Sequence, residues 1–326
     1  MKFTIDIDIK GPDQKIRYPD QLLMVGSCFT EHIGKSLEQL KFPVLQNPNG
    51  ILFDPLSVAM SLMSYTKHRK YSSEDLFYHN ELWHSWHHHS RFSGIDADEV
   101  LNKLNESHES AHNFLKNANW LIITLGSAFA YQLTDKKLFV ANCHKAPAQQ
   151  FIKHLCTIEE INAALDNCLY QLIRYNPRLQ VILTVSPVRH IRDGVINNNR
   201  SKARLLEAVH HLSEKFDRVH YFPAYELVID VLRDYRFYDI DLVHPNYQAT
   251  RYVLEQFLKH FLTEDSQVIA EEVTKIVTAR KHKPFHETSE AHGRFRQLYY
   301  EKTAALSRQY PFLSLKEELD FFSNHQ

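Results

Sequence analysis

Glycine is scarce in this sequence, and its spacing excludes several ligand-binding motifs. The chain of 326 residues has 8 glycines, and the two closest, Gly26 and Gly34, lie eight residues apart. The Walker loop, the dinucleotide-binding G-x-G-x-x-G motif and the G-x-S-x-G nucleophile turn all need glycines much closer together. None of these three motifs is present.

Cysteine, net charge and long apolar runs are also lacking. The 4 cysteines are at least twelve residues apart and form neither a C-x-x-C motif nor a dense disulfide framework, which favours a reducing compartment. The 38 Lys and Arg residues nearly balance the 39 Asp and Glu residues, so no bulk field attracts nucleic acid or an anionic membrane. Residues 1–20 lack the apolar core of a signal peptide, and no apolar run reaches membrane-spanning length. We expect a cytoplasmic protein with neither nucleic acid nor membrane as partner.

Short apolar runs followed by segments of helical period recur along the chain. This rhythm predicts an α/β fold, and runs apolar at every position favour strands covered on both faces, as in a parallel sheet. The expected strands are 22–25, 120–125 and 181–185, with weaker candidates at 43–45 and 219–222, and the expected helices are 99–117, 158–175, 201–215 and 246–262.

Two segments fit this rhythm poorly. Residues 65–94, rich in His and aromatic side chains, are interpreted as an insertion over the sheet edge. Within it, the stretch 83–92 suits either a lid over a substrate site or a simple edge covering. Residues 1–262 are therefore predicted to form an α/β catalytic domain, and residues 263–326 a helical C-terminal extension.

The turn after the first expected strand carries two candidate nucleophiles. Ligands of open parallel sheets collect at the carboxyl ends of the strands, and Ser27 and Cys28 lie at such an end, where a helix begins. A helix N-terminus lowers a thiol pKa, and its free N–H groups can hold an oxyanion. The alternative is that Cys28 is a buried small side chain and Ser27 a helix cap.

A carboxylate and an imidazole lie close together near the other end of the chain. Asp241 precedes His244 by three residues, and Pro245 opens a helix. The carboxylate can orient the ring and fix its tautomer, while the other ring nitrogen faces a nucleophile.

These two segments carry a family resemblance. Gly26-Ser27-Cys28-Phe29-Thr30 resembles the namesake motif of the GSCFA family, with Thr30 in place of the final Ala. That family is similar to the SGNH (GDSL-type) hydrolase superfamily, whose last block is the Asp-x-x-His-Pro found at Asp241–Pro245. Further family-like stretches are Asn49-Gly50, 142–145, 186–190, 201–203 and 232–238, so the resemblance covers about residues 20–262.

The resemblance implies a three-layer α/β/α domain and an activity. Aligning Gly26 and Thr30 with the superfamily's opening Gly-Asp-Ser-Leu-Thr-like block places Cys28 at the nucleophile position, whereas a register shifted by one residue would place Ser27 there. His244 would then be the base and Asp241 its orienting acid. We expect an acyl-ester hydrolase or acyltransferase working through a covalent acyl intermediate. It would act on a small-molecule or glycan acyl ester without a cofactor; no oligomeric state is assigned.

The oxyanion hole departs from the superfamily pattern. The expected Gly-x-Asn-Asp is replaced by Gly126-Ser127-Ala128-Phe129. Ser127 could donate instead, or Asn142 could reach in, with a backbone N–H from Gly50. Asn142 could equally be an ordinary turn residue.

Three further residues are candidates for holding the substrate. His144 and Lys145 follow Asn142 in the same family-like loop, and Arg189 follows the expected strand 181–185. The Arg189 guanidinium suits a carboxylate or phosphate of the substrate, or a structural salt bridge.

Two other functions compete with this hypothesis. His108-Glu109-x-x-His112 matches the H-E-x-x-H zinc peptidase pattern inside an expected helix, but no clear third ligand follows, and His108 shares a helical stripe with leucines. We therefore assign no metal ligand. The missing Gly-x-Asn-Asp also fits a non-catalytic ligand-binding module on a degenerate hydrolase scaffold.

Overall fold

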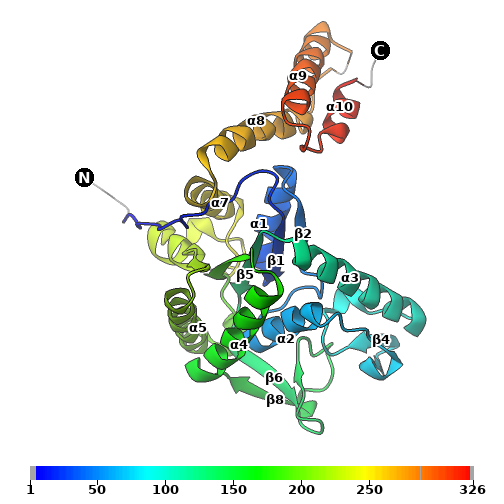
Figure 1. Ribbon diagram of the computed structural model, residues 1–326, viewed down its shortest axis with the longest axis vertical. Helices are drawn as coiled ribbons and strands as arrows, with labels where there is room; N and C mark the ends of the chain where they lie inside the picture. Colours follow the sequence, from blue (N-terminus) through cyan, green and yellow to red (C-terminus); the bar gives the residue numbers. More distant parts are fainter. Residues whose placement is uncertain (1–4, 287, 324–326) are drawn as a thin grey trace.

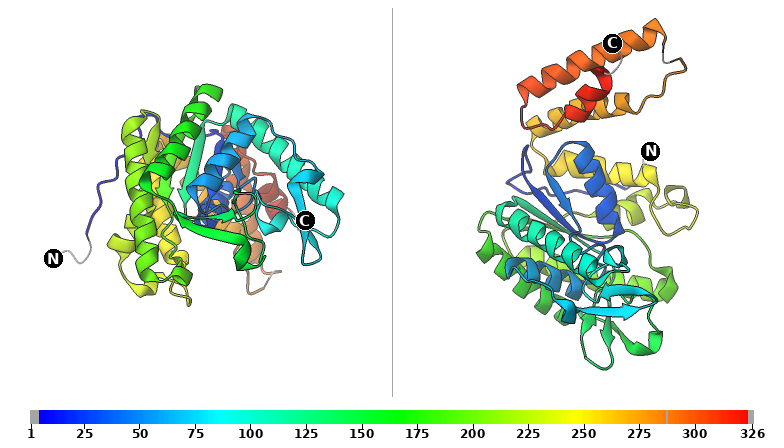
Figure 2. Two further views of the ribbon diagram at one scale, coloured as in Figure 1. Left: turned by 90° about the horizontal axis from the view of Figure 1, so that it is seen from below. Right: turned by 90° about the vertical axis from the view of Figure 1, so that its right-hand side faces the viewer.

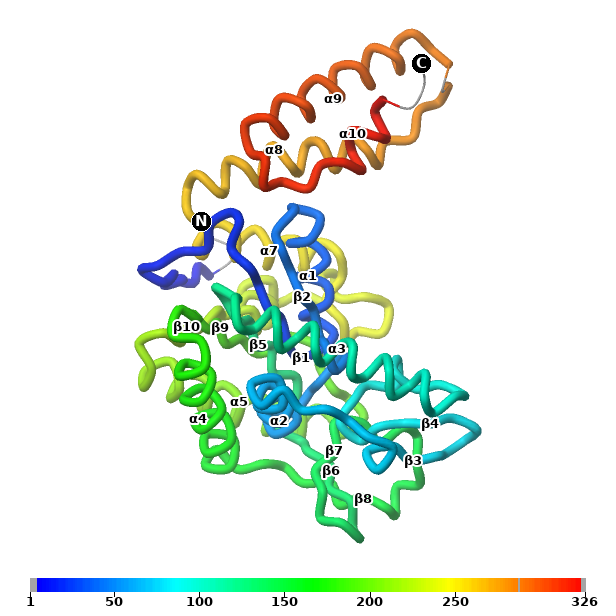
Figure 3. The backbone as a smooth tube through the Cα atoms, turned by 45° about the vertical axis from the view of Figure 1, so that its right-hand side comes forward, coloured from blue at the N-terminus to red at the C-terminus, as the bar shows by residue number. Residues whose placement is uncertain are grey.

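A parallel five-stranded sheet organises the molecule. The computed structural model describes residues 5–286 and 288–323. The strands of this sheet are β1 (Leu22–Gly26), β2 (Val44–Gln46), β5 (Trp120–Leu125), β9 (Gln180–Val185) and β10 (Val219–Tyr221). They pair in parallel in the order β10-β9-β5-β1-β2 (Figure 3).

Helices cover both faces of the sheet. In β1, Leu22 and Met24 face one hydrophobic core and Leu23 and Val25 face the other, because side chains alternate along a strand. The first core includes side chains of α1 (Cys28–Gln39) and α7 (Tyr247–Phe261). The second includes side chains of α2 (Pro55–Thr66), α3 (Ala97–Asn117), α4 (Ile158–Tyr175) and α5 (Val195–Lys215). The predicted three-layer α/β/α fold is confirmed.

The direction of the strand order reverses beside β1. The chain runs from β1 outward to β2 and then crosses to β5 on the other side of β1. In doubly wound sheets of this kind, ligands bind outside the carboxyl ends of the strands at such a reversal. The turn that follows β1 therefore lies where a ligand is expected.

Two small antiparallel sheets accompany the main sheet. The first, within the insertion, is formed by β3 (Leu76–His79) and β4 (Leu82–Ser85). The second has the order β7-β6-β8 and is formed by β6 (Phe129–Leu133), β7 (Phe139–Val140) and β8 (Phe151–Leu155). Short helical turns span Ser73–Asp75, Ser90–Phe92, Ala148–Gln150, Ile191–Asp193, α6 (Ala224–Glu226), Leu227–Leu232 and Tyr235–Phe237.

The C-terminal extension is helical, as predicted, and projects from one end of the α/β domain (Figures 1 and 2). It consists of α8 (Glu264–Arg280), α9 (Glu290–Gln309) and α10 (Lys316–Ser323). The carboxylate of Glu318 pairs with Lys41 just after α1 at 2.8 Å and with Arg280 at 2.9 Å. This shared carboxylate attaches the extension to the end of α1.

Within residues 5–286 and 288–323, no helix combines the length and apolar character needed to cross a membrane.

Candidate active site

The turn between β1 and α1 is built on a glycine that no other residue can replace without strain. Gly26 has φ of +145°, and a Cβ atom there would lie 2.2 Å from the Thr124 carbonyl oxygen of the neighbouring strand. Its N–H donates to the buried Asn47 Oδ1 at 2.8 Å. The turn is thus held between β5 and the loop after β2.

The two candidate nucleophiles in this turn differ in access to solvent. Ser27 is 1% exposed, and its Oγ is buried without a hydrogen-bond partner. It occupies the N-cap position of α1, yet its side chain makes no cap bond. Cys28, the first residue of the helix, is partly exposed. Of the two residues, only Cys28 is therefore partly exposed to solvent.

Opposing electrostatic effects act on the Cys28 thiol. Burial raises its pKa, and the charge of Glu31 acts in the same direction. The backbone N–H groups of Phe29 and Cys28 at the helix N-terminus lower the pKa, as does the charge of Lys202. Because burial is the largest effect, the thiol needs a base to remove its proton.

Asp241 and His244 form a hydrogen-bonded pair in the loop before α7. Asp241 Oδ2 lies 2.6 Å from His244 Nδ1, and Asp241 Oδ1 accepts from the His244 backbone N–H at 3.0 Å. These bonds, the backbone one foremost, lower the pKa of Asp241 to about 2. The carboxylate is therefore ionised at neutral pH, and the ring presents Nε2 away from it.

The loop that carries this pair lies against the carboxyl edge of the sheet and beside α1. The Arg189 N–H donates to the Val243 carbonyl at 3.3 Å, which joins the loop to the segment after β9. A groove of about 600 Å³ has Asp239 and Pro245 on one side and His32 of α1 on another. His32 is one helical turn after Cys28 and on the same side of the helix. The loop and α1 thus border the same groove. Cys28, Asp241 and His244 are not among its lining residues, and no hydrogen bond between described residues joins His244 to Cys28 or Ser27.

At the predicted oxyanion residues, two backbone N–H groups have partners and two side chains accept hydrogen bonds. The Gly50 N–H donates to the Asn47 carbonyl at 2.7 Å, and the Ser127 N–H donates to the Phe53 carbonyl at 2.9 Å. The Ser127 hydroxyl accepts from the Phe129 N–H, and Asn142 Oδ1 accepts from the His144 N–H at 2.8 Å. By contrast, the first N–H groups of α1 have no partner within the helix and lie beside the thiol.

The insertion contacts the loop after β2 and the first turn of α1. His89 packs against Gly50, where an added Cβ atom would lie 2.2 Å from His89 Cβ. Arg91 donates to the Asn47 carbonyl and to Glu31 of α1 at 3.3 Å. Through Arg91, the insertion is attached to both the loop after β2 and the helix that begins at Cys28.

The three candidate substrate-binding residues lie in different surroundings. His144 is buried, bonds to the Ser85 carbonyl at 2.9 Å, and burial lowers its pKa to about 4. Lys145 is exposed. Arg189 lies 5.9 Å from the centre of the Tyr238 ring and, among the described residues, forms no ion pair. Burial, the larger effect, raises the pKa of the Tyr238 phenol, whereas its interaction with the Arg189 guanidinium lowers that pKa.

One residue of this region was missed by the sequence reasoning as a site residue. Lys202 of α5 is 1% exposed, and its Nζ donates to the carbonyls of Gly126 and Ser186 at 2.6 Å each. A signal was present, because Lys202 falls on the same helical stripe as Leu205 and Val209, which are buried. A cation on an apolar stripe is rare unless it has buried partners.

The residues of the zinc-like motif in α3 do not face a common site, because His108 lies in the core and Glu109 at the surface. His108 is buried between the rings of Tyr65 and Tyr71, at 4.9 and 5.2 Å, while Glu109 bonds to His68 at the surface. The described residues contain one group with ligand spacing, His154, Cys156 and Glu160, and the motif is not part of it. In that group Glu160 caps α4 and bonds to His154 at 2.6 Å, and burial raises the Cys156 pKa to about 12. These contacts account for the group without a metal.

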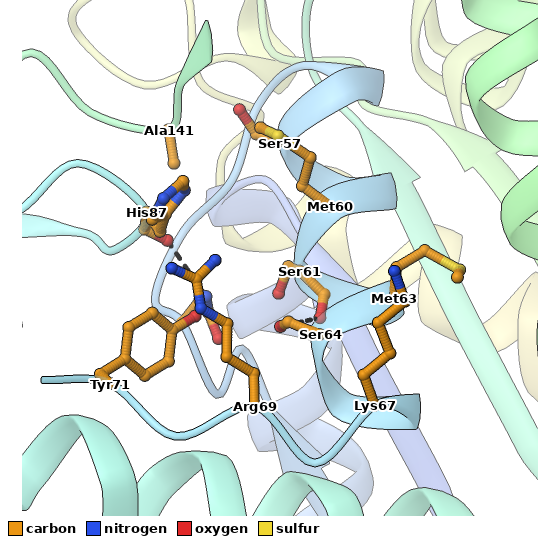
Figure 4. A pocket seen from close by; sticks show the side chains of 11 residues that line it. Ser57, Met60, Ser61, Met63, Ser64, Lys67, Arg69, Tyr71, His87 and Ala141 are labelled. Atoms are coloured by element: carbon orange, nitrogen blue, oxygen red, sulfur yellow. Dashed lines mark hydrogen bonds between the residues drawn. The ribbon is translucent and has the colours of Figure 1, made fainter. Parts of the chain in front are cut away.

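A separate cavity of about 410 Å³ lies beside α2 (Figure 4). Met60, Ser61 and other α2 residues form one side, and Arg69, Tyr71 and His87 of the insertion face them. Neither Cys28 nor His244 lines this cavity.

Two protein-family models match the chain and establish the family to which it belongs. The model of the GSCFA family matches residues 21–257, and that of the GSCFA domain protein C-terminal domain matches residues 273–325. The chain belongs to the GSCFA family. Within this GSCFA protein, Cys28, Asp241 and His244 all lie in the first matched region.

Similarities of the GSCFA protein to solved structures are weak. A carbohydrate esterase family 3 protein from Talaromyces cellulolyticus has 9% identity and a TM-score of 0.37, with 79% of this chain and 98% of that chain covered. An acetyl xylan esterase from the rumen bacterium Butyrivibrio proteoclasticus has 10% identity and a TM-score of 0.37, with coverages of 76% and 64%. At these values the similarities do not indicate an activity. No curated protein matches the chain.

Proposed function

We propose that this GSCFA protein is an acyl-ester hydrolase or acyltransferase with Cys28 as nucleophile. The observation that carries the proposal is the Asp241–His244 pair at 2.6 Å, in a loop that shares a groove with α1. An ionised carboxylate on Nδ1 fixes the tautomer in which Nε2 accepts a proton.

The reaction would proceed in two steps. His244 Nε2 takes the proton of the Cys28 thiol while Sγ attacks the acyl carbonyl carbon, forming a thioester and expelling an alcohol that receives the proton from His244. Water, or a second alcohol, then loses a proton to His244 and attacks the thioester, which releases the acyl product and restores the thiol. The free N–H groups at the start of α1 are the proposed oxyanion donors.

The exposure of the two neighbouring side chains supports Cys28 over Ser27 as the nucleophile. Ser27 is 1% exposed, whereas Cys28 is partly exposed at the helix start. The resemblance to the SGNH superfamily adds an acylated glycan to the proposed substrates, beside small acyl esters.

The experiment measures turnover of p-nitrophenyl acetate by the whole chain and its variants. Cys28→Ala should lower kcat/KM by about a thousandfold or more, because removal of a nucleophile removes the covalent route. Cys143→Ala is the matched control, since Cys143 is also partly exposed but lies outside the proposed machinery. Full activity in Cys28→Ala, with loss in Ser27→Ala, would instead assign the hydroxyl as nucleophile.

A non-catalytic binding module is the second candidate. It is favoured by the engagement of the Gly50 and Ser127 N–H groups within the protein and by the burial that raises the Cys28 pKa. Under this hypothesis the wild type would turn over no short acyl ester, and iodoacetamide would not label Cys28 near neutral pH.

A further inference from the structure

Lys202 is a buried cation at the carboxyl edge of the main sheet. Its Nζ donates to the Gly126 carbonyl after β5 and to the Ser186 carbonyl after β9, each at 2.6 Å. Of the described lysines, only Lys202 is buried. Two carbonyl dipoles offset part of the cost of removing an ammonium group from water.

The surroundings of Lys202 supply no carboxylate. Across the described ranges, no acidic side chain forms an ion pair with Lys202. The titratable groups around it are Cys28 from α1, His190 from the loop after β9, and Tyr225, whose ring centre lies 6.0 Å from Nζ. Burial lowers the pKa of Lys202 to about 7, and Cys28 acts in the opposite direction.

Packing links Lys202 to the proposed nucleophile. Ser27, the residue before Cys28, packs against Gly126 so closely that an added Cβ atom there would lie 3.3 Å from Ser27 Cβ. The same Gly126 provides one of the carbonyls that hold Nζ. Glu31 is a second charged side chain that acts on Cys28, and Arg91 neutralises it in part through an ion pair at 3.3 Å.

We propose that Lys202 is a positioning residue whose ammonium group, fixed by the Gly126 and Ser186 carbonyls, is the counter-charge for the Cys28 thiolate. An opposite charge in a water-poor site stabilises the ionised form of a thiol, and the helix N-terminus adds to this effect. Lys202 gives no proton to the reacting groups, and the thiol proton goes to His244; because the pKa of Lys202 is about 7, its charge is present mainly near and below neutral pH. The role in acyl transfer rests on the proposed function, but the effect on the thiolate does not.

The test follows the alkylation rate of Cys28 by iodoacetamide from pH 6 to pH 10. Mass spectrometry of the Cys28 peptide gives the rate in the wild type, in Lys202→Met and in Lys202→Arg, and the Cys143 peptide of the same samples is the internal control. In Lys202→Met the reaction should be about tenfold slower near pH 6.5, where Lys202 is charged in the wild type, and the difference should shrink above pH 8, because burial lowers the pKa of Lys202 to about 7. Lys202→Arg, which keeps the charge, should restore part of the rate. An unchanged Cys28 profile in a folded Lys202→Met protein would overturn the proposal.

A reciprocal measurement needs no substitution of Lys202. With 13C-labelled lysine, the buried lysine should titrate apart from the exposed ones in the NMR spectrum of the wild type. In Cys28→Ala its titration should move to lower pH, because coupling between two sites acts equally on both. An unmoved titration would contradict the coupling even if Lys202→Met failed to fold.

Ester turnover distinguishes the two proposals. A shifted alkylation profile in a protein that turns over no ester retains the role of Lys202 at the thiolate and rejects acyl transfer. Cys28-dependent turnover with an alkylation profile unaffected by Lys202→Met rejects the role of Lys202 alone.

Discussion

Ser27 and Cys28 are adjacent in sequence but opposite in environment. The Ser27 hydroxyl is buried without a hydrogen-bond partner, and Cys28, the first residue of α1, is partly exposed. This contrast arises because the turn after Gly26 directs Ser27 against the loop after β5 before the helix begins.

Ser27→Ala should not destabilise the fold. A buried hydroxyl without a partner carries a desolvation cost, so its removal should raise the free energy of unfolding by about 1 kcal/mol. Ser201→Ala is the matched control, because Ser201 Oγ is also buried but accepts from the Ala128 N–H at 2.7 Å and bonds to His190. That variant should lose about 1–3 kcal/mol in urea unfolding. Equal losses in the two variants would contradict the contrast.

Asp241→Asn should impair the proposed reaction while leaving the loop in place. The amide keeps an oxygen for the His244 backbone N–H but loses the charge that fixes the ring tautomer, so kcat should fall by about a hundredfold or more. Steady-state kinetics with p-nitrophenyl acetate measure this effect. Asp239→Asn on the same loop serves as control. A normal kcat in Asp241→Asn would show that the pair is structural only.

His144 should make the fold sensitive to acid. Its pKa of about 4 in the folded chain lies below the value near 6.5 expected in the unfolded chain, so between these values only the unfolded chain binds the proton. Stability from this residue is therefore complete near pH 7 and is lost as pH falls toward 4. Urea unfolding should show that the wild type loses about 2 kcal/mol more than His144→Gln between pH 7 and pH 4.5. Parallel pH profiles would contradict this.

Glu318→Gln should weaken the attachment of the C-terminal extension. Its carboxylate is 2% exposed and faces Lys41 and Arg280, so neutralising it leaves two cations together and should cost about 3 kcal/mol. Glu317→Gln is the control, because Glu317 also pairs with Arg280 but is 72% exposed, and its loss should cost less than about 1 kcal/mol. Thermal unfolding would reveal the difference, and similar Tm shifts in both variants would contradict it.

The sequence predicted those elements whose hydrophobic pattern has a single explanation. The strand Trp120–Leu125 and the helix Ile158–Tyr175 agree with the structure at both ends. The helix Pro55–Thr66 was missed because it is buried on several sides, including at Ser57, Ser61 and Ser64, so its apolar residues form no single stripe. The sheet formed by β6, β7 and β8 was also missed, since pairing between Phe129–Leu133 and Phe151–Leu155 depends on a contact that no local pattern records.

In the candidate site, too, the features that depend on local sequence were predictable and those that depend on distant contacts were not. The Asp241–His244 bond could be anticipated from spacing alone, because three residues of loop bring the two side chains together. The hydrogen bonds of the Gly50 and Ser127 N–H groups could not be anticipated from the sequence. Their acceptors, the carbonyls of Asn47 and Phe53, come into reach only when the loop after β2 has folded. The role of Lys202 depends on two strand ends meeting over α5, which only the assembled sheet provides.

The groove beside α1 has walls from both regions that the family models match. His32 and Pro245 belong to the first region, and Thr274 of α8 and Lys281 just after that helix belong to the second. A molecule lying along this groove would touch both regions at once. The shape of the groove therefore depends on how the two regions pack together, whereas Cys28, Asp241 and His244 all belong to the first region.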